Sequence, residues 1–335
     1  MALATRPLGS TGLVVSRLGL GLAALGRPGY ITLGRGRDLP AERTPDALYR
    51  RCADVLDAAL AAGVRYVDAA RSYGRAEEFL ARWLTERGPG ADAITVGSKW
   101  GYRYTADWRV DAVVHEEKEL SQRRFDAQLA ESRALLGRRL ALYQIHSATA
   151  ESGVLEDAPL LRALVDARRR GELRALGLTL TGADARRTLD AALACRVDGE
   201  RVFDVVQATF NVLEPSLRDG LAAAHAEGLG VIVKEAHANG RLTPANTRPA
   251  DAALRSRLER LALEAGVPCD RLAVAYVAAE PWADVVLSGA ATVAQLRSHA
   301  DGAEIVLAPG LREELGALAE SPDLYWGTRA SLPWT

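Results

Sequence analysis

The sequence predicts an α/β fold: a (β/α)8 barrel with an N-terminal β-hairpin and an extended C-terminal tail, forming one domain over residues 1–335. Short runs rich in Val, Ile and Leu alternate with longer segments of helical period, eight of each. The strand candidates are apolar almost throughout, as parallel strands covered on both faces must be. No shift in composition marks a domain boundary, and α/β barrels of this length fold as one unit.

The predicted elements follow one another in a regular order along the chain. A hairpin comes first, over residues 6–19, where Gly9-Ser10-Thr11-Gly12 separates two short apolar runs. Strand candidates cover residues 18–22, 64–68, 93–98, 140–146, 175–179, 202–207, 230–234 and 284–288. Helix candidates cover residues 45–62, 76–86, 119–136, 159–170, 183–194, 216–227, 251–265 and 293–300. This alternation has the element count of a (β/α)8 barrel.

The main alternative is a doubly wound nucleotide-binding sheet. Its mark is GxGxxG running from the first strand directly into a helix. Gly19 and Gly21 match the first two positions, but Ala24 stands at the sixth. The next stretch, residues 26–40, reads GRPGYITLGRGRDLP, and its Gly and Pro content delays the first helix. We therefore prefer the barrel.

Composition and charge exclude several classes of protein. The chain has 42 basic and 43 acidic residues, a net charge of −1 and no basic block, which argues against nucleic-acid binding. No uncharged apolar run reaches the roughly 18 residues of a membrane helix, and the first residues do not resemble a secretory signal. Cys52, Cys195 and Cys269 lie far apart without metal-binding spacing, which fits a reducing compartment. We expect a cytoplasmic protein without a metal or membrane partner, and its oligomeric state stays open.

Polar side chains follow the predicted strands at the end where barrel enzymes place their active sites. The second strand ends in Asp68, and Tyr73 lies in the loop after it. The third strand ends in Lys99 and the fourth in His146. Each residue alone has an ordinary explanation, such as a cap, a solvated lysine or a packed histidine. Because the strands are consecutive, however, the four side chains can converge, which favours a catalytic site.

These four side chains form a set that can move a proton. A tyrosine has a reference pKa near 10, too high for fast proton donation at neutral pH, and a neighbouring ammonium lowers that pKa. We expect Asp68 to hold Lys99 beside Tyr73. We expect His146 to hydrogen-bond the oxygen on which charge develops. No side chain donates hydride, so a redox step requires a nicotinamide cofactor.

The chain resembles the aldo-keto reductases over nearly its whole length. The segments that carry the resemblance are RPLGSTGLVVSRLGLG, YVDAARSYGRAE, ITVGSKWG, LALYQIHS, VVQATFNVLEP, GRLT and SGAATVAQL. The family's catalytic tetrad corresponds, in order, to Asp68, Tyr73, Lys99 and His146. The resemblance implies a (β/α)8 barrel that binds NADPH without a Rossmann domain and reduces carbonyl groups to alcohols.

The resemblance also implies a set of cofactor-binding residues, with the adenine end near the seventh and eighth strands. Gln207 corresponds to the glutamine that binds the nicotinamide carboxamide, and Phe210 stands where a stacking tyrosine is common. The full expected set is Gly21, Thr179, Gln207, Phe210, Lys234, Gly240, Ser288, Gly289, Ala290, Thr292, Gln295 and His299.

Two loops depart from the family pattern near the nicotinamide and the phosphates. Thr179-Leu180 replaces the Ser-Asn pair that holds the carboxamide. Glu235 follows the seventh strand beside the expected pyrophosphate. A carboxylate there repels phosphate unless it turns away or pairs with Lys234 or Arg241.

The segment after the eighth strand departs as well. Gln295 stands where many family members place an arginine for the 2′-phosphate of NADPH. Ser298 and His299 stand where a glutamate and an asparagine usually contact adenine. We expect NADPH as the cofactor, with NADH as the alternative.

Aromatic residues gather after the predicted catalytic lysine and in the C-terminal tail. We expect Trp100 and Trp108 to bind the substrate, because they lie just past Lys99. Indole rings suit both flat aromatic ketones and sugars, so the substrate class stays open. The alternative is that these loop aromatics pack on one another.

The sequence therefore predicts an NAD(P)H-dependent oxidoreductase acting on a small-molecule carbonyl or alcohol. A non-redox acid–base enzyme on the same barrel, a lyase or hydrolase, is one alternative, and the altered Thr179-Leu180 and Glu235 keep it open. The other is a cofactor-sensing binding subunit, like the potassium-channel β subunits that the family resembles in part. The complete tetrad argues against that alternative.

Overall fold

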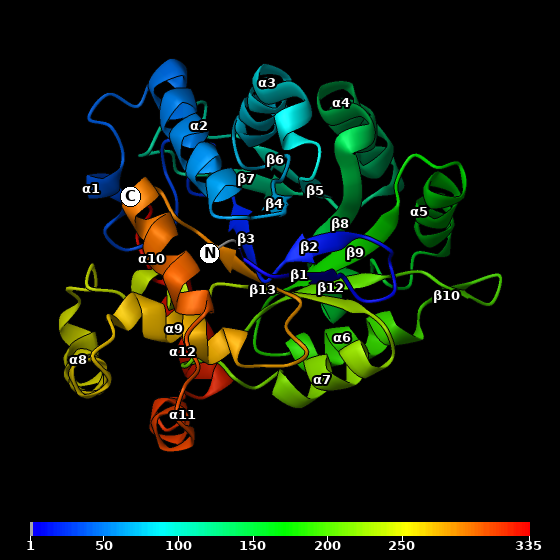
Figure 1. The fold of residues 1–335 in the computed structure, drawn as a ribbon. Helices are drawn as coiled ribbons and strands as arrows, with labels where there is room; N and C mark the ends of the chain where they lie inside the picture. The colour runs from blue at the N-terminus through cyan, green and yellow to red at the C-terminus, as the bar shows by residue number, and fades with distance from the viewer. Residues whose placement is uncertain (1–2) are drawn as a thin grey trace.

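The computed structural model describes residues 3–335, in which eight parallel strands close into a barrel (Figure 1). The strands are β3 (Leu18–Gly21), β4 (Tyr66–Asp68), β5 (Thr95–Trp100), β8 (Leu140–Ala148), β9 (Ala175–Leu180), β12 (Val205–Thr209), β13 (Gly230–Lys234) and β14 (Val285–Ser288). Each of these strands pairs with the next, and β14 pairs with β3 to close the barrel. The predicted barrel is confirmed.

Helices surround the barrel between successive strands (Figure 1). They are α2 (Pro45–Ala61), α3 (Ala76–Arg87), α4 (Gln122–Leu136), α5 (Ala158–Arg169), α6 (Ala185–Ala194), α7 (Arg218–Ala226), α8 (Ala252–Ala265), α9 (Cys269–Ala278) and α10 (Val293–Ala303). The Ser121 side chain caps α4 by accepting a hydrogen bond from the Arg124 N–H. Because a capping residue is not itself helical, α4 begins at Gln122, whereas the sequence predicted a start at residue 119.

Several elements were not predicted from the sequence. They are α1 (Arg35–Asp38), the hairpin of β6 (Tyr102–Tyr104) and β7 (Glu116–Lys118), the small pair β10 (Arg196–Val197) and β11 (Glu200–Arg201), and α9. The C-terminal tail also folds into α11 (Pro309–Gly316) and α12 (Pro322–Ala330) before residues 331–335. The β6–β7 hairpin and α12 matter for function because both contribute residues to the cavity described below.

The predicted N-terminal hairpin lies across the amino-terminal end of the barrel, in front in Figure 1. It pairs β1 (Thr5–Pro7) with β2 (Val14–Ser16) in antiparallel fashion. Leu8, Leu13 and Val15 are buried in one cluster with inward-facing side chains of the barrel strands. Fully burying one aliphatic side chain contributes about 1.5–3 kcal/mol, so this contact is a substantial part of the core. The hairpin closes this end of the barrel.

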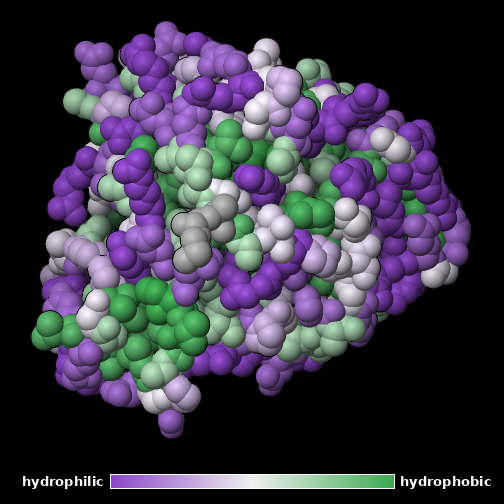
Figure 2. All heavy atoms as spheres, viewed as in Figure 1, coloured by the Kyte–Doolittle hydropathy of each residue, from purple (hydrophilic) through white to green (hydrophobic). Residues whose placement is uncertain are grey.

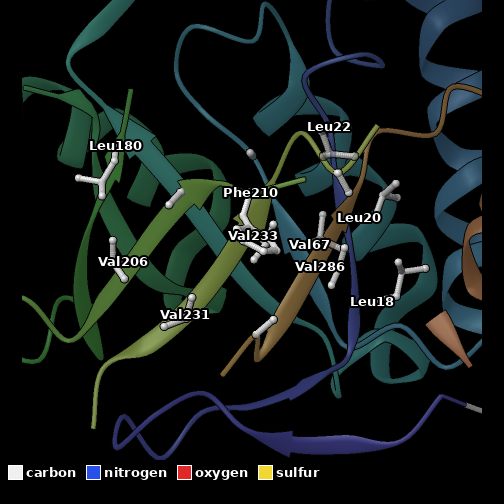
Figure 3. Packing of buried hydrophobic residues seen from close by; sticks show 14 of the residues in the cluster. Leu18, Leu20, Leu22, Val67, Leu180, Val206, Phe210, Val231, Val233 and Val286 are labelled. Carbon is white, nitrogen blue, oxygen red and sulfur yellow. The ribbon is translucent and has the colours of Figure 1, made fainter. Parts of the chain in front are cut away.

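The larger part of the core lies between the strands and the helices. Leu18, Leu20, Val67, Val231 and Val233 belong to it (Figure 3). Successive side chains of a strand point to opposite faces, so these residues alternate with side chains that point into the barrel. Packing on both faces explains why the strands are almost continuously apolar in sequence.

The face seen from the hairpin side is mainly hydrophilic, with one hydrophobic area where Figure 1 draws α8 and α9 (Figure 2). Leu263 of α8 is among the large apolar residues that are exposed. Within residues 3–335, no helix combines the length and the apolar character that crossing a bilayer requires.

Candidate active site

A cavity of about 620 Å³ opens at the carboxyl ends of the barrel strands, away from the hairpin. Residues that end β4, β8, β12, β13 and β14 contribute to its wall. The rest of the wall comes from residues 27–43, here called the arm, from the β6–β7 hairpin and from Arg329 and Trp334 near the C-terminus. The volume lies in the usual range for small-molecule and cofactor sites.

The four predicted catalytic residues come together in this cavity. Asp68 pairs in register with Gly97 of the neighbouring strand, so Lys99, two residues further, points to the same side. The Lys99 ammonium forms an ion pair with Asp68 and donates hydrogen bonds to the Tyr73 hydroxyl at 3.2 Å and the Ala69 carbonyl at 2.9 Å. Both members of the ion pair are almost fully buried. The strand register therefore brings Lys99 to Asp68, and the loop after β4 brings the Tyr73 phenol to Lys99.

The Asp68 carboxylate receives further hydrogen bonds inside the barrel. Its Oδ1 accepts from the Tyr66 hydroxyl at 3.1 Å, from Gln207 Nε2 at 3.1 Å and from Gln144 Nε2 at 3.3 Å. A Cβ at Gly97 would collide with the Tyr66 hydroxyl, so a glycine there leaves room for this phenol. These three donors, together with Lys99, hold the Asp68 carboxylate in a single orientation.

The Tyr73 phenol lies between charged and aromatic neighbours. Its ring meets the His146 ring edge to face, with centroids 5.5 Å apart, and the Arg27 guanidinium lies 5.2 Å from its centre. Burial and the Asp68 carboxylate raise the pKa of Tyr73 well above 10, although Arg27 lowers it. The net direction is opposite to the lowered pKa that the sequence analysis expected, because burial and the Asp68 carboxylate outweigh the neighbouring cations. The Tyr73 hydroxyl is therefore protonated at neutral pH.

The His146 imidazole is uncharged. Burial lowers its pKa well below 6.5, and the Lys99 and Arg27 cations lower it further. Its Nδ1 lies 3.5 Å from the Ser72 hydroxyl, and its ring meets that of Tyr102 at 5.0 Å. A neutral imidazole in the wall of the cavity can donate one hydrogen bond to an oxygen without bringing a charge.

A second charged cluster, of which the sequence suggested Glu235 and Lys234 but not Arg329, faces the cavity across from the tetrad. Glu235 follows β13 and accepts hydrogen bonds from the Arg329 guanidinium at 2.6–3.1 Å and from the Thr209 hydroxyl at 3.0 Å. Lys234 lies 3.9 Å from this carboxylate. Burial disfavours the charged form of Glu235 and so raises its pKa. The Arg329 and Lys234 cations outweigh this effect and lower the pKa to about 2. The carboxylate is neutralised in place.

The main partner of Glu235 is Arg329, whereas the sequence analysis considered Lys234 and Arg241. Arg241 instead pairs with Asp251 and Glu320. Glu235 itself has a φ of 60°, a conformation that non-glycine residues seldom adopt. No local pattern in the sequence could have identified Arg329, which is 94 residues away on α12.

The arm folds over the cavity and is tied down at both sides. The Leu33 N–H donates to the Asn239 carbonyl at 2.9 Å, and the Asn239 side chain donates to the Ile31 carbonyl at 2.8 Å. Tyr30 and Thr335 exchange two backbone hydrogen bonds, at 3.0 and 3.1 Å. The arm, the loop after β13 and the C-terminal end therefore form one cover.

Most of the predicted cofactor-binding residues lie in the wall of the cavity. They are Gly21, Thr179, Gln207, Lys234, Gly240, Ser288, Gly289, Gln295 and His299. Near the tetrad, Gln207 donates to Asp68, and the Thr179 hydroxyl accepts from the Ser147 N–H at 2.7 Å.

Three other predicted cofactor-binding residues lie outside the wall. Phe210 is buried beneath the strand layer and stacks on Tyr276, with ring centroids 6.1 Å apart. Ala290 is fully buried. Thr292 caps α10 by accepting a hydrogen bond from the Gln295 N–H. These three positions have structural roles in this fold.

The two tryptophans predicted to bind substrate also lie outside the cavity wall. Because side chains alternate along a strand and Lys99 points inward, Trp100 points outward, against Phe125 of α4 at 5.2 Å. Trp108 donates its indole N–H to the Arg43 carbonyl at 2.6 Å. The aromatic wall comes instead from Tyr30 of the arm, Tyr102 of β6 and Trp334 of the tail.

Known proteins resemble the chain in sequence profile and in fold. The Aldo/keto reductase family profile matches residues 17–314. An aldo-keto reductase from Bacillus halodurans in its holo form gives a TM-score of 0.71 at 20% identity, over 95% of this chain and 97% of that one. A Pseudomonas aeruginosa protein described as an aldo-keto reductase gives 0.64 at 24% identity, over 89% and 93%. At these identities the two structures establish a common fold. No curated protein matches the chain.

Proposed function

Because the chain belongs to the aldo/keto reductase family, we propose that it is a nicotinamide-dependent oxidoreductase that reduces a carbonyl to an alcohol, or catalyses the reverse reaction. One observation carries the proposal: the Tyr73 hydroxyl lies 3.2 Å from the buried Lys99 ammonium, in the wall of a cavity large enough for a ligand. A non-redox enzyme needs only a cavity that fits its substrate, whereas this cavity is lined both by residues of the tetrad and by residues of α10.

The residues present fit a nicotinamide dinucleotide. The cavity continues from the tetrad, inside the barrel, outward to α10 in the helix layer. Gly289 faces it without a side chain, and a Cβ there would meet no other atom within 4 Å. Thr179 and Gln207 would hold the carboxamide, and Gln295 and His299 the adenosine. The positive end of the α10 dipole favours the phosphates.

Lys234 is the cation in the wall that suits the phosphates best. Burial lowers its pKa to about 8, so it remains mainly charged at neutral pH. Its ammonium donates to the Thr209 hydroxyl at 2.7 Å. The pairing of Glu235 with Arg329 removes the main electrostatic objection to a phosphate here, which the sequence had raised.

Each tetrad residue has a defined part in the proposed reaction. A bound nicotinamide nucleotide supplies or accepts the hydride. Tyr73 holds its proton on the phenolic oxygen and donates it to the substrate oxygen, while Lys99 stabilises the phenolate that this leaves. Asp68 keeps Lys99 charged and in place. His146, uncharged, donates a hydrogen bond that orients the substrate oxygen.

The test is nucleotide binding followed by turnover. We expect NADH or NADPH to quench the tryptophan fluorescence, and carbonyl and alcohol panels to change the nicotinamide absorbance. Tyr73→Phe should lower turnover at least about 10²-fold with unchanged nucleotide affinity, the usual minimum for a general acid. Tyr143→Phe is the matched control, because this β8 tyrosine bonds to Ser132 outside the cavity wall. Failure of both nucleotides to bind at millimolar concentration would rule out the proposal.

A further inference from the structure

We propose that the cavity selects NADH over the NADPH that the family resemblance implies, because Asp38 and Asp270 line the end that would receive the adenosine ribose. This inference rests on the proposed function. It concerns residues of the arm and of α9 that the sequence analysis did not single out. If the nicotinamide lies against Tyr73, the adenosine half must extend towards α10, the other end of the same cavity.

The two carboxylates lie against one face of α10. Asp38 Oδ2 accepts a hydrogen bond from Gln295 Nε2 at 2.8 Å. Asp270 Oδ2 accepts one from the Ser298 hydroxyl at 2.6 Å. Gln295 and Ser298 are three residues apart on a helix, so their side chains are neighbours about 5–6 Å apart at Cβ. Both negative charges are therefore held within about one helical turn of each other.

Guanidinium groups close to this end are directed elsewhere. Arg51 lies outside the wall and donates to the backbone carbonyl of Asp38 at 3.1 Å. Arg271 also lies outside the wall; it pairs with Asp301 at 3.0 Å and donates to the Ser298 hydroxyl at 3.1 Å, not to either of the two carboxylates at this end. Arg35 is buried in the arm, where its guanidinium donates to four backbone carbonyl oxygens, those of Ala24, Arg27, Pro28 and Thr335. Of the three, Arg35 lines the cavity, and its charge partly offsets that of Asp38. Its five N–H groups all donate to backbone carbonyls, however, so none is left to bind a phosphate.

The remaining titratable groups at this end are uncharged. The rings of His237 and His299 lie against each other, with centroids 4.1 Å apart and planes tilted by 31°. Burial lowers the pKa of both rings below 6.5, so neither carries a positive charge at neutral pH. The two neighbouring rings offer an apolar and hydrogen-bonding surface for a base, and the two aspartates supply the negative charge of this end.

Ribose hydroxyls and a 2′-phosphate meet these carboxylates differently. A hydroxyl donates a hydrogen bond to a carboxylate, and this is how an acidic residue recognises the ribose of NAD in other folds. A phosphate monoester carries a charge of about −1.5 to −2 at neutral pH and accepts hydrogen bonds. An ionised carboxylate also only accepts hydrogen bonds, so it offers the phosphate no donor. A 2′-phosphate close to the carboxylates of Asp38 and Asp270 would be repelled strongly, because like charges interact more strongly in a partly buried site than in water. The wall is complementary to NADH.

The first experiment measures dissociation constants of NADH and NADPH by fluorescence quenching at low ionic strength. We expect NADH to bind at least about 30-fold more tightly, and added salt to narrow that ratio because it screens the repulsion. Equal or tighter binding of NADPH would overturn the inference and leave the proposed function standing. Binding of neither nucleotide would instead remove the proposed function, and the inference with it.

The second experiment changes the charges. Asp38→Asn and Asp270→Asn keep the shape and remove one charge each, and each should lower the NADPH-to-NADH ratio of dissociation constants at least about fivefold. The control is Asp190→Asn, an exposed partner of Arg186 on α6, which should leave the ratio unchanged.

A third variant covers the case in which the asparagine variants do not fold. Ala294 is exposed on α10 and lines the cavity, so Ala294→Arg adds a cation at a tolerant position and should tighten NADPH binding selectively. An unchanged ratio in the folded variants would show that the carboxylates do not select the nucleotide, and would overturn the inference.

Discussion

Asp68 and Glu235 are both carboxylates at the end of a barrel strand, and both pair with a cation beside the same cavity. Asp68 takes its partner, Lys99, from the adjacent strand, and the register of the sheet fixes the pair. Glu235 takes its partner, Arg329, from the C-terminal helix α12, which approaches from outside the barrel. One pair is part of the barrel framework, and the other depends on how the tail docks.

This difference in construction indicates a difference in role. Lys99 of the first pair donates to the Tyr73 hydroxyl, so in the proposed reaction this pair bears directly on proton transfer. The Glu235 pair neutralises a charge and holds α12 against the barrel. We therefore expect changes to the first pair to affect turnover and stability together, and changes to the second to affect mainly stability.

Lys99→Met should have the largest effect. It leaves Asp68 as an unpaired buried charge, which typically costs about 3–5 kcal/mol of unfolding free energy. It also removes the cation that stabilises the Tyr73 phenolate, so turnover should fall at least about 10²-fold while nucleotide affinity stays largely intact. Urea unfolding and steady-state kinetics check this. Lys118→Met, at the rim on β7 and outside the cavity wall, is the matched control; a loss of nucleotide binding alone would reassign Lys99.

Arg329→Met should destabilise the protein by about 3 kcal/mol, at the lower end for a broken buried pair because Arg329 is partly exposed. Turnover should change less than about tenfold. Adding Glu235→Gln should recover part of the lost stability, because the unpaired charge is gone. Arg260→Met, in an exposed pair on α8, serves as control. A fall in turnover as large as that of Lys99→Met would mean that the second pair takes part in the chemistry.

Acid should weaken the second pair in a defined pH window. The pKa of Glu235 is about 2 in the folded protein and 4.5 when unpaired, so its stabilisation is complete above pH 4.5 and is lost as the pH falls towards 2. Between pH 5 and pH 3 this loss amounts to about 2 kcal/mol. Urea unfolding across this window should therefore show a shallower decline for Glu235→Gln than for wild type, with Glu264→Gln as control. Parallel curves would contradict the assignment.

Removing one hydroxyl from each pair should have the smallest effects. Tyr66→Phe removes one of the donors to Asp68, and Thr209→Val removes the hydroxyl between Lys234 and Glu235. Each should cost about 1 kcal/mol, the usual net contribution of a hydrogen bond. Turnover should change only for Tyr66→Phe, and by less than about tenfold. Thermal unfolding and kinetics of both variants would show whether the loss of a single hydroxyl affects turnover at the Asp68 pair and only stability at the Glu235 pair.

Much of the fold could be predicted because the sequences of the barrel strands are compatible with few other structures. Their apolar runs require cover on both faces, and the structure places them within a few residues of the predicted bounds. Helix α9 was missed for the opposite reason. Residues 272–278 are all buried, so the helix shows no polar face and no helical periodicity in the sequence.

The candidate site was predictable where it depends on sheet geometry and not where it depends on distant packing. The four tetrad residues each end or follow a strand, so their meeting could be anticipated, although their roles remain predictions. The alternation of β5 could have shown that Trp100 points away once Lys99 points inward. Arg329 and Trp334 could not have been found, because nothing in a single sequence shows where a C-terminal tail docks.

The sealed amino-terminal end of the barrel has a practical consequence for anyone who shortens the chain. The family match spans residues 17–314, which makes those bounds an attractive choice for a minimal fragment. Such a fragment would lack Leu8, Leu13 and Val15, exposing the apolar floor of the barrel to water. It would also lack Arg329, stranding Glu235 without its counter-ion. A fragment of residues 17–314 would lack both the hairpin that closes the amino-terminal end of the barrel and the C-terminal segment that lines the cavity. We therefore expect it to express poorly and to be less soluble than the full chain.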